Sequence, residues 1–227
     1  MRHLLKWLSI SLLLMIAILI TFLLAFDIED YRVQIQNAAT KAVGHEVEVR
    51  GSISLKPSLV PQIVLKDVNI KNPSWASRLN LAEVGFFELT FDLLSLLGDE
   101  LVITEVSLDK IDLLIEYSSQ GKTNWQKQQQ SKNRDKNFVA NFSKVSIKNS
   151  SIGLITRERQ RFQLEIEHAA ITVDSDMSVG LKIEGDYKDI PFFLSASSKS
   201  INSLLNSKPL PVSLKLESGK SFFTYLG

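Results

Sequence analysis

An uncharged run of twenty residues near the N-terminus, followed by residues that alternate apolar and polar almost to the end, constrains this chain more than any other feature. Residues 7–26 contain no charged side chain. As a helix they would span about 30 Å, the thickness of the hydrocarbon core of a bilayer. Alternation with a period of two is typical of β-strands that bury one face. Together the two patterns predict a membrane-anchored β-protein.

Charges on either side of the apolar run predict its orientation. Arg2 and Lys6 precede the run, whereas Asp27 and Glu29 follow it. Because positive charge is retained on the cytoplasmic side of a bilayer, we expect residues 1–6 to form a cytoplasmic tail, with residues 7–26 as a single transmembrane anchor and the rest across the membrane. A cleaved signal peptide is the alternative, but its apolar core would be about 7–15 residues long and would end at small residues.

Composition excludes several classes of function. The 26 lysines and arginines offset 25 aspartates and glutamates, with the signs interspersed, which argues against a nucleic-acid partner. The chain has no cysteine, so it can form neither a disulfide nor a thiolate metal site. No catalytic motif is present, and His3, His45 and His168 have no second metal ligand at a useful spacing. We therefore expect no metal, no cofactor and no enzymatic activity.

The rest of the chain divides into a short helix and a β-rich body. Residues 27–44 carry apolar residues at helical spacing, with Asp27 suited to the N-cap and Gly44 to the C-terminal left-handed position. From Glu46 the period becomes two. The stretch 126–137 is polar throughout and predicts a solvated loop. The expected order is a linker helix (27–44), a first β-repeat unit (45–125), the loop (126–137) and a second unit (138–227), which we expect to be incomplete.

A short motif, apolar-x-x-Val-x-aliphatic followed by a polar turn, recurs along the body. It spans residues 65–72, 103–110 and 142–149, and residues 166–171 form a weaker fourth copy. In each copy the strand enters with one phase of the alternation and leaves with the other, which is consistent with a bulge or bend at the intervening pair of residues. Such repeats indicate a structure that grows in one direction. Chance recurrence of ordinary strand patterns is the alternative.

A half-apolar sheet has to cover its apolar face, and no long amphipathic helix follows residue 44 to do so. The sheet could close on itself as a sandwich or barrel, or it could wrap into a groove that shelters something apolar. Trp75 and Trp125 lie beside turns, where a tryptophan more often covers the end of a core than forms a platform for a ligand.

The order of several segments resembles a known family. After the apolar run come residues 30–35 (DYRVQI), 43–51 (VGHEVEVRG), 65–75 (LKDVNIKNPSW), 92–97 (DLLSLL) and 121–125 (GKTNW). Residues 185–191 and 209–214 extend the resemblance towards the C-terminus. In this order they resemble the N-terminal region of the AsmA family of Gram-negative envelope proteins.

The resemblance implies a mainly β fold: a transmembrane helix and a short amphipathic helix followed by a curved, repeat-built antiparallel β-sheet groove. It also implies an inner-membrane protein with its body in the periplasm, which shelters or conducts phospholipid acyl chains for outer-membrane maintenance. The implied partners are phospholipid, the inner membrane and other envelope proteins. The alternative is a scaffold or chaperone-like module that assists outer-membrane protein assembly through its sheet edges. Because family members are usually far longer, we expect either part of a longer product or a short module that needs partners.

The apolar phase of the strands supplies the candidate lining of the groove, with no catalytic residue among them. These candidates are Val47, Val49, Phe87, Leu89, Phe91, Ile111, Leu113, Ile115, Leu164, Ile166, Leu181 and Ile183.

Overall fold

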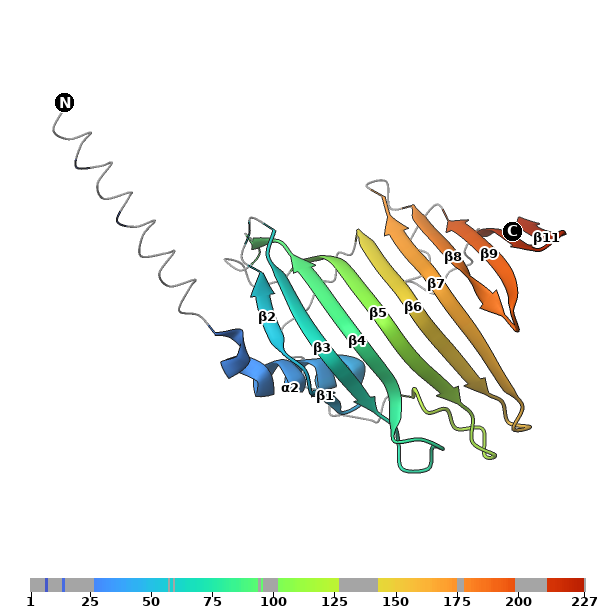
Figure 1. The fold of residues 1–227 in the computed structure, drawn as a ribbon, viewed down its shortest axis with the longest axis horizontal. Helices are drawn as coiled ribbons and strands as arrows, with labels where there is room; N and C mark the ends of the chain where they lie inside the picture. The colour runs from blue at the N-terminus through green and yellow to red at the C-terminus, as the bar shows by residue number, and fades with distance from the viewer. Residues whose placement is uncertain are drawn as a thin grey trace.

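The computed structural model describes residues 27–56, 58, 60–93, 95, 102–126, 143–174, 178–198 and 212–226, together with Trp7 and Leu14. The fold is mainly β, one large open mixed sheet of 11 strands with a helical segment at its N-terminal end (Figure 1). The predicted anchor at 7–26 lies outside the described residues apart from Trp7 and Leu14. Among the residues that are described, no helix has the length and apolarity needed to cross a membrane.

The helical segment consists of the 3-10 helix η1 (Ile28–Tyr31) and the α-helix α2 (Arg32–Val43). The Asp27 carboxylate accepts a hydrogen bond from the Glu29 backbone N–H at 2.9 Å, as expected of an N-cap. Gly44 ends α2 in the left-handed conformation with φ of 82°, which glycine adopts without steric cost. The predicted caps of the linker helix are therefore confirmed.

The strands form a nearly sequential array. Their order across the sheet is β1-β3-β4-β5-β6-β7-β8-β9-β10-β11, and β2 pairs with β3 beside β1. The strands are β1 (Val47–Val49), β2 (Ile53–Lys56), β3 (Gln62–Lys71), β4 (Asn80–Phe91), β5 (Ile103–Glu116), β6 (Lys144–Ile155), β7 (Arg161–Val173), β8 (Val179–Tyr187), β9 (Ile190–Ser198), β10 (Val212–Ser218) and β11 (Ser221–Leu226).

The expectation of a purely antiparallel sheet is wrong at one place, because β5 and β6 run parallel. A parallel neighbour requires the chain to return to the same end of the sheet before pairing, which takes a long connection. Residues 117–143 provide that connection, and the predicted polar loop at 126–137 falls within it, outside the described residues beyond Gln126. The repeat copies at 103–110 and 142–149 consequently lie side by side in register, with Val106 opposite Val145.

The predicted change of phase within the repeat copies is confirmed wherever they are described. In β3 it occurs at Asp67, which has a left-handed φ of 51°. The second copy has a register shift opposite Thr90 and Phe91, and the fourth has one between Ile166 and His168. The third copy begins at Phe142, outside the described residues. Each irregularity returns the apolar side chains to the same face of the sheet.

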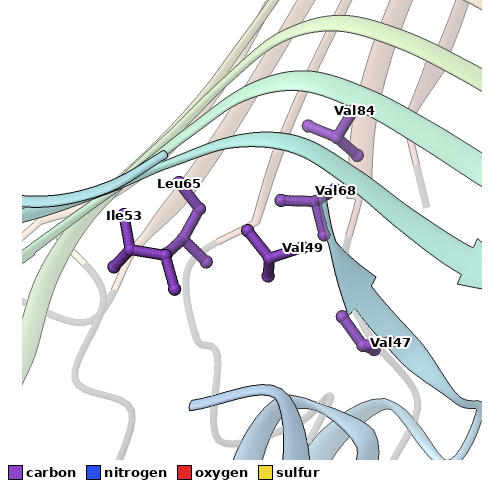
Figure 2. Packing of buried hydrophobic residues seen from close by; sticks show 6 residues of the cluster. All are labelled: Val47, Val49, Ile53, Leu65, Val68 and Val84. Carbon is purple, nitrogen blue, oxygen red and sulfur yellow. The ribbon is translucent and has the colours of Figure 1, made fainter. Parts of the chain in front are cut away.

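The closed hydrophobic core lies at the N-terminal end of the sheet. Figure 2 shows its six buried side chains between the strands and the helix drawn in blue. Ile28 of η1 and Ile35 and Ala39 of α2 pack against this cluster, as their predicted helical stripe requires. The cluster consists of Val47, Val49, Ile53, Leu65, Val68 and Val84.

Candidate functional site: the apolar face of the sheet

Apolar side chains form two uninterrupted rows across ten strands, from β2 to β11. Residues that lie opposite each other on paired strands share one face of the sheet, so the strand register defines each row. The first apolar row is Ile53, Leu65, Phe87, Leu108, Ile147, Ala169, Ile183, Leu194, Leu216 and Phe223. The second apolar row is Leu55, Ile63, Leu89, Val106, Val145, Ile171, Leu181, Ala196, Leu214 and Tyr225.

The opposite face of the same strands is polar. The residues next to the second apolar row along each strand form a row on this opposite face. Only its last member, Leu226, has an apolar side chain. Its members are Lys56, Gln62, Thr90, Glu105, Lys144, Thr172, Gly180, Ser197, Ser213 and Leu226. The sheet therefore has an apolar face and a face on which polar side chains predominate, with exceptions such as Val64 and Phe193. We call them the apolar face and the polar face.

Shorter apolar rows extend the apolar face on the other side of the bends. Val49, Val68, Val84 and Ile111 lie opposite one another across β1, β3, β4 and β5. A further row crosses six strands and a third crosses three. The six-strand row is Val47, Ile70, Ala82, Leu113, Ile152 and Leu164, and the three-strand row is Ile115, Leu154 and Phe162.

In the described part of the chain, a helical segment covers the apolar face at its N-terminal end. Among the described elements, the substantial contacts other than those between paired strands join α2 to β1 and to η1, and η1 to β2. Along the first apolar row the exposed fraction rises from 3% at Ile53 and 6% at Leu65 to 36% at Leu216 and 57% at Phe223. Neither a sandwich nor a closed barrel forms in the described part of the chain.

The structure places the twelve candidate lining residues on this apolar face, but not all in the same environment. Val47 and Val49 belong to the closed core beneath the helical segment, with 5% and 3% of their surface exposed, so they do not form an open lining. Phe91 and Ile166 are also buried. The other eight are partly exposed. Their contact with a lipid stays a prediction.

Sequence reasoning missed much of the first apolar row, including Leu108, Ile147, Leu194 and Phe223. Leu108 and Ile147 occupy the aliphatic position of the repeat motif, so the repeat itself carried the signal. Leu194 and Phe223 lie in strands whose neighbours could be identified only from the observed register.

A buried polar network joins the loops at one end of the central strands. Glu116 accepts hydrogen bonds from the Ser77 backbone N–H (2.8 Å) and from Arg159 (2.7 Å). Asn124 donates to Asn72 at 3.0 Å and accepts a hydrogen bond from the Glu116 backbone N–H. Burial acts to raise the pKa of the Glu116 carboxyl, but the bonds from Ser77 and Arg159 outweigh it and hold the pKa below its ordinary value.

The two tryptophans beside this network are only partly covered. Trp75 and Trp125 have 38% and 42% of their surface exposed, so neither closes the end of a core. The Trp125 ring packs edge-on against Tyr117, with the ring centroids 5.1 Å apart. This arrangement stabilises the loop after β5.

Neither a metal centre nor a deep cavity competes with the apolar face as the candidate site. In the described part of the chain, no group of three or more histidine, aspartate or glutamate side chains could hold a metal ion. A hollow of about 660 Å³ is lined by residues such as Gly153, Gln163 and Glu165, which belong to the polar face. It mixes charges of both signs, whereas the apolar face is an open surface.

Comparisons with known proteins agree with this architecture. The model of the AsmA family matches residues 1–219. Searches of curated proteins and of solved structures find no match. Because the family match covers nearly the whole chain, the protein belongs to the AsmA family, and this membership suggests a function related to the cell envelope.

Proposed function

We propose that this protein is anchored in the inner membrane through residues 7–26 and shelters or conducts phospholipid acyl chains on the apolar face of its periplasmic sheet. The observation that supports the proposal best is the continuity of the two apolar rows on a face that no described element covers beyond the first strands. An acyl chain on this face would take the place of the missing second layer.

The dimensions of the rows suit such a ligand. Strands are spaced about 4.8 Å apart, so a row across ten strands extends roughly 40 Å. A lipid tail spans about 15 Å, half the hydrocarbon thickness of a bilayer. The rows are therefore long enough for more than one tail, or for a tail to move from strand to strand.

The binding mode needs no catalytic group. Apolar contact is non-directional, and each buried methylene contributes about 0.8 kcal/mol. Because all positions along a row are aliphatic or aromatic, a tail would meet similar contacts at successive strands. Lipid headgroups would remain in water beyond the margin of the apolar face. Binding without a strongly preferred position is what conduction along a surface requires.

The alternative function, a scaffold for outer-membrane protein assembly, would use an unpaired edge of the sheet and not its apolar face. Backbone groups at the β1 edge are already bound by side chains of the helical segment, for example Val49 N–H by Gln36. Any further strand pairing would therefore be restricted to single strands at the margins of the described sheet. The apolar rows cross the whole sheet, which favours the lipid proposal over a function confined to one edge.

A pair of photo-crosslinking variants tests the proposal. Leu194 lies on the apolar face and its neighbour Phe193 on the polar face of the same strand, and both are partly exposed. A photoreactive amino acid at Leu194 should capture phospholipid in living cells, whereas the same group at Phe193 should capture little. Equal lipid capture at both positions, or none at Leu194 while the protein is folded, would contradict the proposal.

A further inference from the structure

Two aromatic rings and a guanidinium gather just beyond the end of β5. The Tyr117 ring meets the Trp125 ring edge-on, with the ring centroids 5.1 Å apart. The Arg157 guanidinium lies over the Tyr117 ring, 5.9 Å from its centroid. We call these three residues the margin cluster. Because Arg157 comes from the turn between β6 and β7, the cluster joins that turn to the loop after β5.

Alternation along β5 places the margin cluster at the limit of the apolar face. Ile115 belongs to the three-strand row, and Glu116, the next residue, faces the other way into the buried polar network. The Tyr117 backbone N–H donates to the Ile155 carbonyl oxygen at 3.0 Å, so pairing with β6 continues to this residue. An extended strand turns successive side chains to opposite faces. Tyr117 therefore lies on the apolar face, directly beyond the three-strand row.

The Arg157 guanidinium is held in place without being neutralised. Gly121, with a left-handed φ of 77°, has no side chain to displace it, whereas a Cβ there would lie 3.2 Å from the Arg157 Nη2. In the described part of the chain, Arg157 is exposed and forms no ion pair with a carboxylate. A guanidinium packed on an aromatic ring keeps the N–H donors that bind carboxylate or phosphate in pairs. Arg157 is therefore available to an external anion.

Positive charge predominates in the two segments that carry the margin cluster, residues 117–126 and 156–161. Arg159 is already bound to the Glu116 carboxylate at 2.7 Å. The other charged side chains of the two segments are Lys122, Arg157, Arg161 and Glu158. Three cations against one anion favour a negatively charged ligand. Because the charges of the whole chain nearly cancel, this excess is a local feature.

We propose that the margin cluster binds the phosphate group of a phospholipid whose tail lies on the adjoining apolar rows. The inference rests on the proposed function and deepens it, because it adds a preference for lipids that carry phosphate. Tyrosine and tryptophan are typical of the level at which headgroups meet hydrocarbon, since each has an apolar body and a polar tip. The two rings would contact the start of the tail, and Arg157 would bind the phosphate oxygens.

The length of a lipid tail suits this orientation. Four residues of strand span about 13 Å, so a tail of about 15 Å that begins beside Tyr117 would pass Ile115 and Leu113. The tail would then lie along the strands, with the headgroup in water at their ends. A lipid would still move from strand to strand across the sheet, because an exposed ion pair contributes little and would only slow it at the margin cluster.

Lipid selection by the full-length protein tests the proposal. The protein in non-ionic detergent is incubated with equal amounts of phosphatidylglycerol and of diacylglycerol with the same tails, and the copurifying lipids are measured. The wild type should retain about fivefold more phosphatidylglycerol, the upper range for one exposed ion pair. Arg157→Gln should abolish this preference and leave the retained diacylglycerol unchanged, because the apolar rows remain intact.

The matched control is Arg161→Gln. Arg161 lies on the polar face, one residue before Phe162 of the three-strand row, and its removal should leave the preference as in the wild type. Arg157→Lys should keep part of the preference, because lysine retains the charge but not the paired donors. Circular dichroism should be the same for all variants. No preference in the wild type, or the same preference in Arg157→Gln, would overturn the inference and leave the proposed function standing. Retention of neither lipid would overturn both.

Competition distinguishes a lipid headgroup from free phosphate. Millimolar inorganic phosphate, compared with chloride at the same ionic strength, should leave the preference for phosphatidylglycerol unchanged, because the tail supplies most of the binding. Loss of the preference in inorganic phosphate would replace the lipid assignment with a site for free phosphate.

Discussion

The two ends of the first apolar row show one sequence pattern in two environments. Ile53 at one end is 3% exposed and Phe223 at the other is 57% exposed, although both follow the same alternation of apolar and polar residues. At the first end, η1 and α2 place Ile28, Ile35 and Ala39 over the strands. At the second end, no described element lies over the sheet. The difference shows that alternation determines the faces of the sheet, whereas a covering element determines which part becomes a closed core.

The helical segment is held at the covered end by polar as well as apolar contacts. Glu29 accepts a hydrogen bond from the Ile53 backbone N–H at 2.7 Å, and Arg32 bonds to the Gly51 carbonyl oxygen at 2.8 Å. These bonds satisfy backbone groups of strands that have no neighbour on that side. The same segment therefore closes both a face and an edge, and its short length limits both effects to the first strands.

The largest expected effect compares two leucines of the first apolar row. Leu65→Ala should lower the free energy of unfolding by about 2–5 kcal/mol, because it leaves a cavity in the closed core. Leu216→Ala should lower it by about 1 kcal/mol or less, because that side chain is already 36% exposed. Urea unfolding of the full-length chain in detergent, followed by circular dichroism, measures both. Equal losses would mean that the C-terminal end of the apolar face is covered as well.

A smaller effect concerns the buried polar network. The pKa of Glu116 lies below the ordinary value of 4.5, so its stabilisation is present above that value and is lost as pH falls through the folded-state pKa. Glu116→Gln should lower the free energy of unfolding at pH 7 by about 1.5–3 kcal/mol. The variant should also lose less stability than the wild type when the pH is lowered below about 4.5.

The matched control for this prediction is an exposed ion pair at the open end of the sheet, Lys215 with Glu217. Lys215→Gln should change the free energy of unfolding by less than about 1 kcal/mol, because exposed pairs contribute little. Urea unfolding at several pH values measures both variants. A loss from Lys215→Gln as large as that from Glu116→Gln would contradict the contrast between a buried and an exposed pair.

The smallest expected effect concerns the protected edge. Gln36→Ala should cost about 1 kcal/mol, because it leaves the Val49 backbone N–H without its partner. Hydrogen exchange of the Val49 amide should become faster, whereas amides of β10 should be unchanged. Gln34→Ala on the exposed side of α2 is the control and should have no effect. Unchanged Val49 exchange in Gln36→Ala would mean that the helix does not protect this edge.

Local features of the fold could be predicted from the sequence because they depend on neighbouring residues. Asp27 and Gly44 define the ends of the helical segment, and the repeat motif correctly indicates the change of phase at Asp67. The parallel pairing of β5 with β6 could not be predicted, because alternation does not specify which strands become neighbours. The burial of Val47 and Val49 beneath α2 was missed for the same reason. Their environment depends on where the preceding helix packs, which the alternation along a strand does not specify.

The parallel pairing of β5 with β6 also bears on how the chain could acquire more units. Lys110 and Asn149, both with left-handed φ, occupy the same position in their repeat copies and fall beside each other on adjacent strands. In an antiparallel arrangement, the half of one copy that precedes its bend would face the half that follows the bend in the other. In the observed parallel arrangement the two copies are related by a shift from one strand to the next, so equivalent halves lie beside each other. An inserted unit of the same kind would lengthen the sheet while preserving the line along which it curves.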